Sequence, residues 1–122
     1  MSKCMFEKIA LFAFYIGLVV ITLLSLLKLP TGTGTAITAG SKGYIGHGLA
    51  YCILTIVGWV AFSSPRGALV GFILVFGMCL EAMQLLISYR TFNPLDIASN
   101  GTGVLVGCGM AAIFNRLLVI DR

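Results

Sequence analysis

The sequence predicts an all-α membrane protein built as a bundle of four transmembrane helices. The first observation is composition, since 59% of the 122 residues are hydrophobic, 10% are charged and the mean hydropathy is +1.06. Soluble domains carry about 45–50% apolar and about 25% charged residues. The second is length, because a span needs about 20 apolar residues. Residues 1–122 are therefore expected to form a single membrane domain of about four spans, with no room among them for a soluble catalytic domain.

The apolar runs and the residues that interrupt them place helices at about 9–27, 45–62, 67–88 and 94–118. Lysines before the first run are also typical of a signal peptide. However, this run is longer than a usual signal core and no Ala-x-Ala site follows it, so a membrane helix is expected. Threonines and glycines alternate after it and predict a loop over 31–43. Pro94 suits the first turn of the fourth helix, where a backbone N–H is not needed.

Four spans place both termini on one side of the membrane. Basic residues are then more numerous on that side, with Lys3, Lys8, Arg66, Arg116 and Arg122 against Lys28, Lys42 and Arg90 on the other. The positive-inside rule predicts that the termini are cytoplasmic. These residues are spread singly, without the clustered basic face that nucleic-acid binding requires, so no nucleic-acid partner is expected.

The cysteines predict no metal or cofactor site. They form no Cys-x-x-Cys pair and the chain has one histidine, so neither a metal ion nor haem is expected. Three of the four lie in apolar segments, where a free thiol behaves as a small hydrophobic side chain.

One carboxylate, Glu81, lies inside the third span, which carries no other charge. An ionisable side chain at the bilayer centre costs roughly 2.5–3.5 kcal/mol on insertion scales, so it is expected to face a protein interior or a cavity. It is either a structural carboxyl that is hydrogen-bonded or ion-paired, or a general acid, base or proton carrier.

Further polar residues recur at helical spacing and form one stripe on each of the last three helices. The stripes are His47 with Tyr51; Glu81 with Gln84 and Ser88; and Asp96 with Asn100, Gly103 and Gly107. In the four-span topology the polar part of each stripe lies near the outer end of its helix. The sequence therefore predicts a polar cleft that opens outward.

Candidate catalytic residues in this cleft are Glu81, His47 and Asp96. His47 is the natural base for either carboxylate to orient, or else an interfacial histidine bonded to a loop. Asp96 is equally suited to cap its own helix, near the favourable N-terminus.

Candidate ligand-binding residues are Arg90, Tyr51, Gln84 and Asn100. The planar fork of Arg90 grips carboxylate or phosphate at two points, although the residue also suits an interfacial anchor. Gln84 and Asn100 are further expected to link helices through their amides. Tyr51 is expected to pack at the interface, with its hydroxyl in the polar network.

Gly103 and Gly107 form a Gly-x-x-x-Gly motif, which allows another helix backbone to approach closely. Packing within the bundle is favoured over dimerisation, because the polar half of the same stripe already faces inward.

These residues together resemble the VanZ-like family of small bacterial membrane proteins. The resemblance covers about Lys42 to Ala112, on His47-x-x-x-Tyr51, Glu81-x-x-Gln84, Arg90 followed by Asp96, Asn100, Gly103 and Gly107. The family's Asp-Lys shortly before the histidine is replaced by Ser41 and Lys42 further upstream, and its Phe after the histidine by Gly48. The resemblance implies a four-helix protein of the bacterial inner membrane, from a family whose namesake is linked to low-level resistance to the glycopeptide teicoplanin.

Three functions follow as hypotheses. The first is an outward-facing site for an anionic lipid or cell-wall precursor, with Arg90 and His47 at the anion and the carboxylates at a hydroxyl. The second is an accessory subunit that docks partner membrane proteins. The third is an intramembrane hydrolase or transferase, which is less favoured because no Ser-His-Asp order, metal set or cysteine nucleophile is visible.

Overall fold

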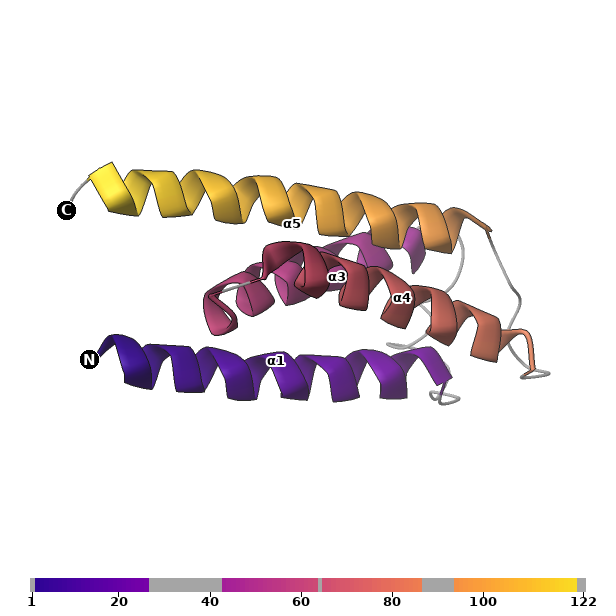
Figure 1. Ribbon diagram of the computed structural model, residues 1–122. Helices are drawn as coiled ribbons and strands as arrows, with labels where there is room; N and C mark the ends of the chain where they lie inside the picture. The colour runs from indigo at the N-terminus through magenta and orange to yellow at the C-terminus, as the bar shows by residue number, and fades with distance from the viewer. Residues whose placement is uncertain (1, 27–42, 64, 87–93, 121–122) are drawn as a thin grey trace.

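The computed structural model describes residues 2–26, 43–63, 65–86 and 94–120, which form four helices and no strand. These are α1 (Lys3–Leu26), α3 (Gly43–Ala61), α4 (Arg66–Gln84) and α5 (Pro94–Ile120). Successive helices run in opposite directions, so α1 begins at the same end of the bundle at which α5 finishes (Figure 1). We call this the terminal end. The opposite end, where α1 and α4 finish and α3 and α5 begin, is the site end. The predicted all-α bundle is confirmed.

The helix boundaries differ from the predicted spans by more than two residues at two places. α1 begins at Lys3 rather than at Ile9, because the Ser2 side-chain oxygen accepts a hydrogen bond from the backbone N–H of Met5 at 3.3 Å. Such a cap satisfies a free donor of the first turn, so the helix continues through its charged start. α4 ends at Gln84 rather than Ser88, where the backbone N–H groups of the next two residues bond three residues back. The predicted loop lies almost entirely outside the described residues.

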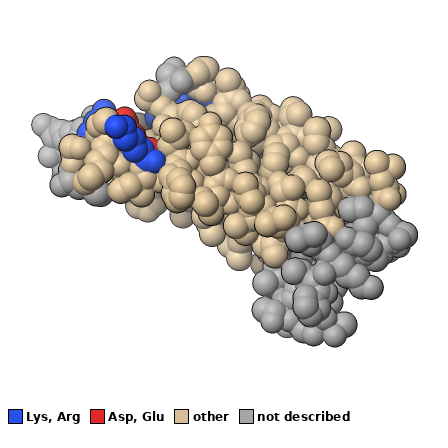
Figure 2. All heavy atoms as spheres, turned by 90° about the horizontal axis from the view of Figure 1, so that it is seen from below, with Lys and Arg blue, Asp and Glu red and all other residues tan. Residues whose placement is uncertain are grey.

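Three of the helices are long and apolar enough to cross a membrane. They are Lys3–Leu26, Arg66–Gln84 and Pro94–Leu117. The apolar stretch of α3, Ile45–Ala61, is shorter. Large apolar side chains such as Phe12 and Leu105 point outward from the bundle. On the face seen in Figure 2, the described charged side chains gather towards one end and the rest of the described surface is uncharged. Such a surface fits a bilayer.

The tightest helix contact joins α3 to α5 through the Gly-x-x-x-Gly motif. A Cβ built on Gly103 would collide with the backbone oxygen of Gly48, and one on Gly107 would lie 2.8 Å from the backbone oxygen of Cys52 and 2.9 Å from Cβ of Thr55. The two glycines therefore lie directly against α3, within the chain. This contact fixes the start of α3 beside the start of α5.

α1 packs on the other side of α3, around Phe14. This ring is 2% exposed and meets Phe62 edge to face, with centroids 5.3 Å apart. Its Cε2 atom lies 2.9 Å from the position that a Cβ on Gly58 would take, so the ring packs directly against this glycine. At the terminal end, the Arg66 guanidinium stacks 4.4 Å above the Trp59 ring and donates a hydrogen bond to the Trp59 carbonyl oxygen. The arginine thereby closes the last turn of α3.

Candidate functional site

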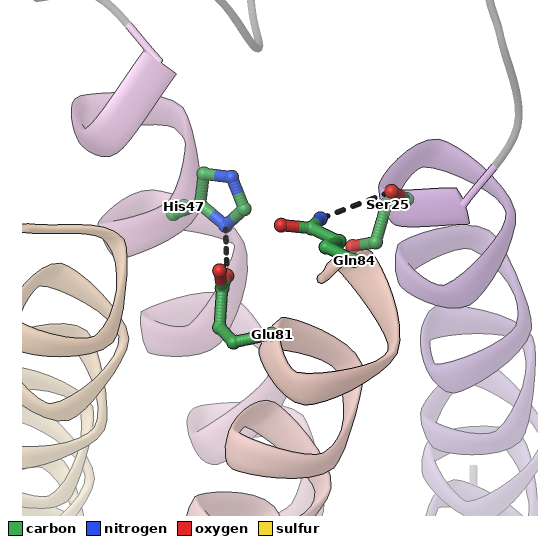
Figure 3. A network of polar contacts seen from close by, with 4 residues as sticks. All are labelled: Ser25, His47, Glu81 and Gln84. Carbon is green, nitrogen blue, oxygen red and sulfur yellow. Dashed lines mark hydrogen bonds and ion pairs between the residues drawn. The ribbon is translucent and has the colours of Figure 1, made fainter. Parts of the chain in front are cut away.

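Three helices meet at the site end through their polar side chains. His47 lies in the first turns of α3, Glu81 in the last turn of α4, and Asp96 in the first turn of α5. One ligating atom from each lies within 4.8 Å of the other two. Nδ1 of His47 is 3.9 Å from Oε1 of Glu81, and Figure 3 shows the ring facing this carboxylate. We call these three residues the polar cluster.

The polar cluster places two carboxylates close together, one of them with little exposure to solvent. The Glu81 side chain is 2% exposed and that of His47 12%. Two ionised carboxylates less than 5 Å apart repel each other by about 3 kcal/mol at an effective dielectric constant of about 20. A positive charge placed between the two carboxylates, such as a bound cation, would offset this repulsion.

Gln84 joins α4 to α1 beside the cluster. Its amide nitrogen donates a hydrogen bond of 3.0 Å to the backbone oxygen of Ser25, and both residues are buried (Figure 3). Ser25 lies in the last turn of α1, where backbone oxygens have no partner within the helix. The amide of Gln84 thus links two helices, and the interaction involves α1, which carries none of the sequence-predicted stripes.

We expect Gln84→Met to lower the free energy of unfolding by about 1 kcal/mol, the usual worth of a polar link between membrane helices. Ser25→Ala is the matched control, because it leaves the accepting backbone oxygen in place and should change stability by less than about 0.5 kcal/mol. Unfolding of the purified variants by SDS in mixed micelles, followed by circular dichroism, measures both. Equal losses in the two variants would contradict the assigned hydrogen bond.

Tyr51 and Asn100 lie one turn deeper than His47 and Asp96. Tyr51 is 1% exposed, and its ring fills the space against Gly77, where a Cβ would approach Cε1 to 3.0 Å. Asn100 is 5% exposed, and neither polar atom of its side chain has a hydrogen-bond partner among the described residues. A buried amide left unpaired costs about 1–3 kcal/mol. A purely structural role for Asn100 would therefore lower the stability of the fold.

The remaining predicted site residues take different places. Arg90 lies outside the described residues. Gly103 and Gly107 lie deeper on the α5 stripe and hold α3 and α5 together beneath the cluster. Their role is to fix the distance between His47 and Asp96, which stand on the two helices that they join.

A pocket that sequence reasoning missed lies between α1 and α3. Its wall is mostly apolar and includes His47, so the pocket adjoins the polar cluster directly. The lining residues are Ile21, Leu24, Ser25, Gly46, His47, Ala50 and Tyr51. Ser25 is the polar residue that α1 contributes to this wall, and its place near the end of a mostly apolar run was a local sign that α1 takes part.

Comparison with known proteins adds no identification. No family model, no curated protein and no solved structure matches this chain.

Proposed function

We propose that the chain is a VanZ-like protein of the bacterial inner membrane that binds the head group of an anionic lipid or lipid-linked cell-wall precursor at the polar cluster. The observation that carries this proposal is the junction of two unlike surfaces at His47. One side of this residue faces the buried carboxylate of Glu81, and the same residue lines the apolar pocket between α1 and α3. A ligand that fits both surfaces is amphipathic, with a polar head and an apolar chain.

The charges of the cluster indicate how a head group would be held. Glu81 and Asp96 are acceptors and bind hydroxyl or amine groups, whereas a protonated His47 donates to an oxygen anion. The site end is the outer end if the termini are cytoplasmic, as the positive-inside rule predicts. This role is binding and orientation, and it requires no covalent step.

The test is to fill the pocket without touching the polar residues. Ala50→Leu adds volume inside the pocket that Ala50 lines. Ala68→Leu is the matched control, since Ala68 is exposed at the start of α4, at the terminal end. Native mass spectrometry of the full chain would compare retention of phosphatidylglycerol, undecaprenyl diphosphate and phosphatidylcholine. We expect Ala50→Leu to weaken binding of an anionic lipid by about tenfold, equivalent to about 1.4 kcal/mol, and Ala68→Leu to bind like the wild type.

The probes separate the sources of the head group. Preference for undecaprenyl diphosphate supports a cell-wall precursor, and preference for phosphatidylglycerol supports a membrane phospholipid. Equal retention of all three lipids, or an equal loss of lipid binding in Ala50→Leu and Ala68→Leu, would overturn the proposal. Co-purification with a membrane protein partner in place of lipid would favour an accessory subunit.

A further inference from the structure

We propose that the polar cluster is a binding site for a divalent metal ion, with a ring nitrogen of His47 and one carboxylate oxygen each from Glu81 and Asp96 as ligands. The sequence predicts no metal site, because it has no Cys-x-x-Cys pair and a single histidine. The three cluster residues themselves are far apart along the chain. The fold brings them together from three different helices. This inference goes beyond head-group binding and does not depend on it.

The geometry is close to that of a metal centre. The three ligating atoms lie within 4.8 Å of one another, and Nδ1 of His47 is 3.9 Å from Oε1 of Glu81. Bonds of about 2.0–2.1 Å at tetrahedral angles place zinc ligands about 3.3 Å apart. The His47–Glu81 separation must therefore shorten by about 0.6 Å, and no separation by more than about 1.5 Å, which side-chain rotations can supply. Three protein ligands leave a position open for water or another oxygen ligand.

The charge of the cluster favours a cation over a protonated imidazole alone. Two carboxylates carry two negative charges, which one divalent ion neutralises and one imidazolium does not. Burial of Glu81 strengthens this demand, since the surroundings screen its charge poorly.

Asn100 provides a second, independent observation. Its amide is buried, has no hydrogen-bond partner among the described residues, and lies one turn after Asp96 on the face of α5 that packs against α3. An amide oxygen is a common ligand for hard cations and a common acceptor for a metal-bound water. A polar interior that contains water and an ion gives this side chain the partner that the described protein atoms do not.

The ligand set selects the chemical class of the ion. One imidazole nitrogen with carboxylate oxygens suits Zn²⁺ or Mn²⁺, whereas an all-oxygen site would suit Mg²⁺ or Ca²⁺. A bound ion would also present positive charge to the phosphate of a head group, although the metal site is testable without any lipid.

The experiment is metal binding by the full chain, purified in detergent through a tag without histidines, because His47 is the only histidine in the sequence. After treatment with EDTA and its removal, calorimetric titration with ZnCl₂ and with MnCl₂ should show one ion bound per chain. We expect His47→Ala, Glu81→Gln and Asp96→Asn each to weaken binding at least tenfold, since even outer-shell changes cost about 10- to 100-fold. Glu7→Gln on α1, at the terminal end, should bind like the wild type.

Two measurements keep the result unambiguous. A variant with all four cysteines replaced by alanine must retain binding, which excludes zinc held by the thiols, two of which are exposed. In the wild type, NMR of the ring-labelled single histidine reports the metal directly and requires no destabilising variant. Absence of stoichiometric binding, histidine signals unchanged at saturating Zn²⁺ and Mn²⁺, or binding that is lost in the cysteine-free variant would each overturn the proposal.

Discussion

We expect Gly103→Ala to destabilise the protein by about 3 kcal/mol or more, although it adds only one methyl group. The added Cβ would collide with the backbone oxygen of Gly48 and lie 2.9 Å from its carbonyl carbon. Backbone atoms cannot rotate away as a side chain does, so α5 must move off α3 along their closest contact. Overpacking in a filled interior typically costs about 1–3 kcal/mol, and the cost is higher where nothing flexible yields.

Two alanine variants serve as controls for this prediction. Gly101→Ala lies on the same helix with nothing within 4 Å of its Cβ, and Gly48→Ala lies on the other side of the same contact, where Cβ meets only the Ser99 backbone oxygen at 3.5 Å. Both should be neutral or stabilising by up to about 1 kcal/mol, because alanine is the better helix former. SDS unfolding of the three variants in one detergent gives the comparison. Similar stabilities for Gly103→Ala and Gly101→Ala would show that α3 and α5 are not in this contact.

The same contact shows how far the sequence determines the fold. Hydropathy located all four helices, because each apolar run is bounded by a charge, a proline or a polar turn, and Pro94 marked the first residue of α5. Helical spacing also put Asp96, Asn100 and Gly103 on one face. It did not say which helix that face meets. The complementary surface on α3 includes Gly48, which the sequence presents only as a departure from the VanZ pattern.

The site was predictable where it depends on periodicity and missed where it depends on distant contacts. His47, Glu81 and Asp96 were expected to converge, because the topology places their helix ends together. The participation of α1 was not expected, since the hydrogen bond from Gln84 ends on the backbone oxygen of Ser25, and any residue type carries such an oxygen. The metal-like spacing of the cluster likewise depends on helix separation, which the glycines of α5 set.

We expect Glu81→Leu to fold as stably as the wild type, within about 1 kcal/mol, while its binding of anionic lipid falls at least tenfold. Replacing a buried charged residue by an apolar one of similar volume is often neutral or stabilising, because the desolvation penalty disappears. The usual penalty for breaking a buried pair, about 3–5 kcal/mol, arises when the partner is left uncompensated. In Glu81→Leu, the His47 imidazole still has the Asp96 carboxylate within 4.8 Å. His47 is therefore not left without an acidic partner.

This prediction separates a functional carboxylate from a structural one. SDS unfolding measures stability, native mass spectrometry measures lipid binding, and Glu7→Leu at the terminal end controls for the loss of a charge. Glu81→Gln preserves the size and hydrogen bonding of the side chain and should lose binding to a similar degree. A loss of about 3 kcal/mol or more in Glu81→Leu with normal stability of Glu81→Gln would assign Glu81 to holding the bundle together by hydrogen bonds. Unchanged stability together with unchanged binding in both variants would place the ligand elsewhere. The expected combination is intact folding with lost binding. It would mean that Glu81 is kept at bilayer depth, despite the free-energy cost of inserting a carboxylate there, because of the ligand that it binds.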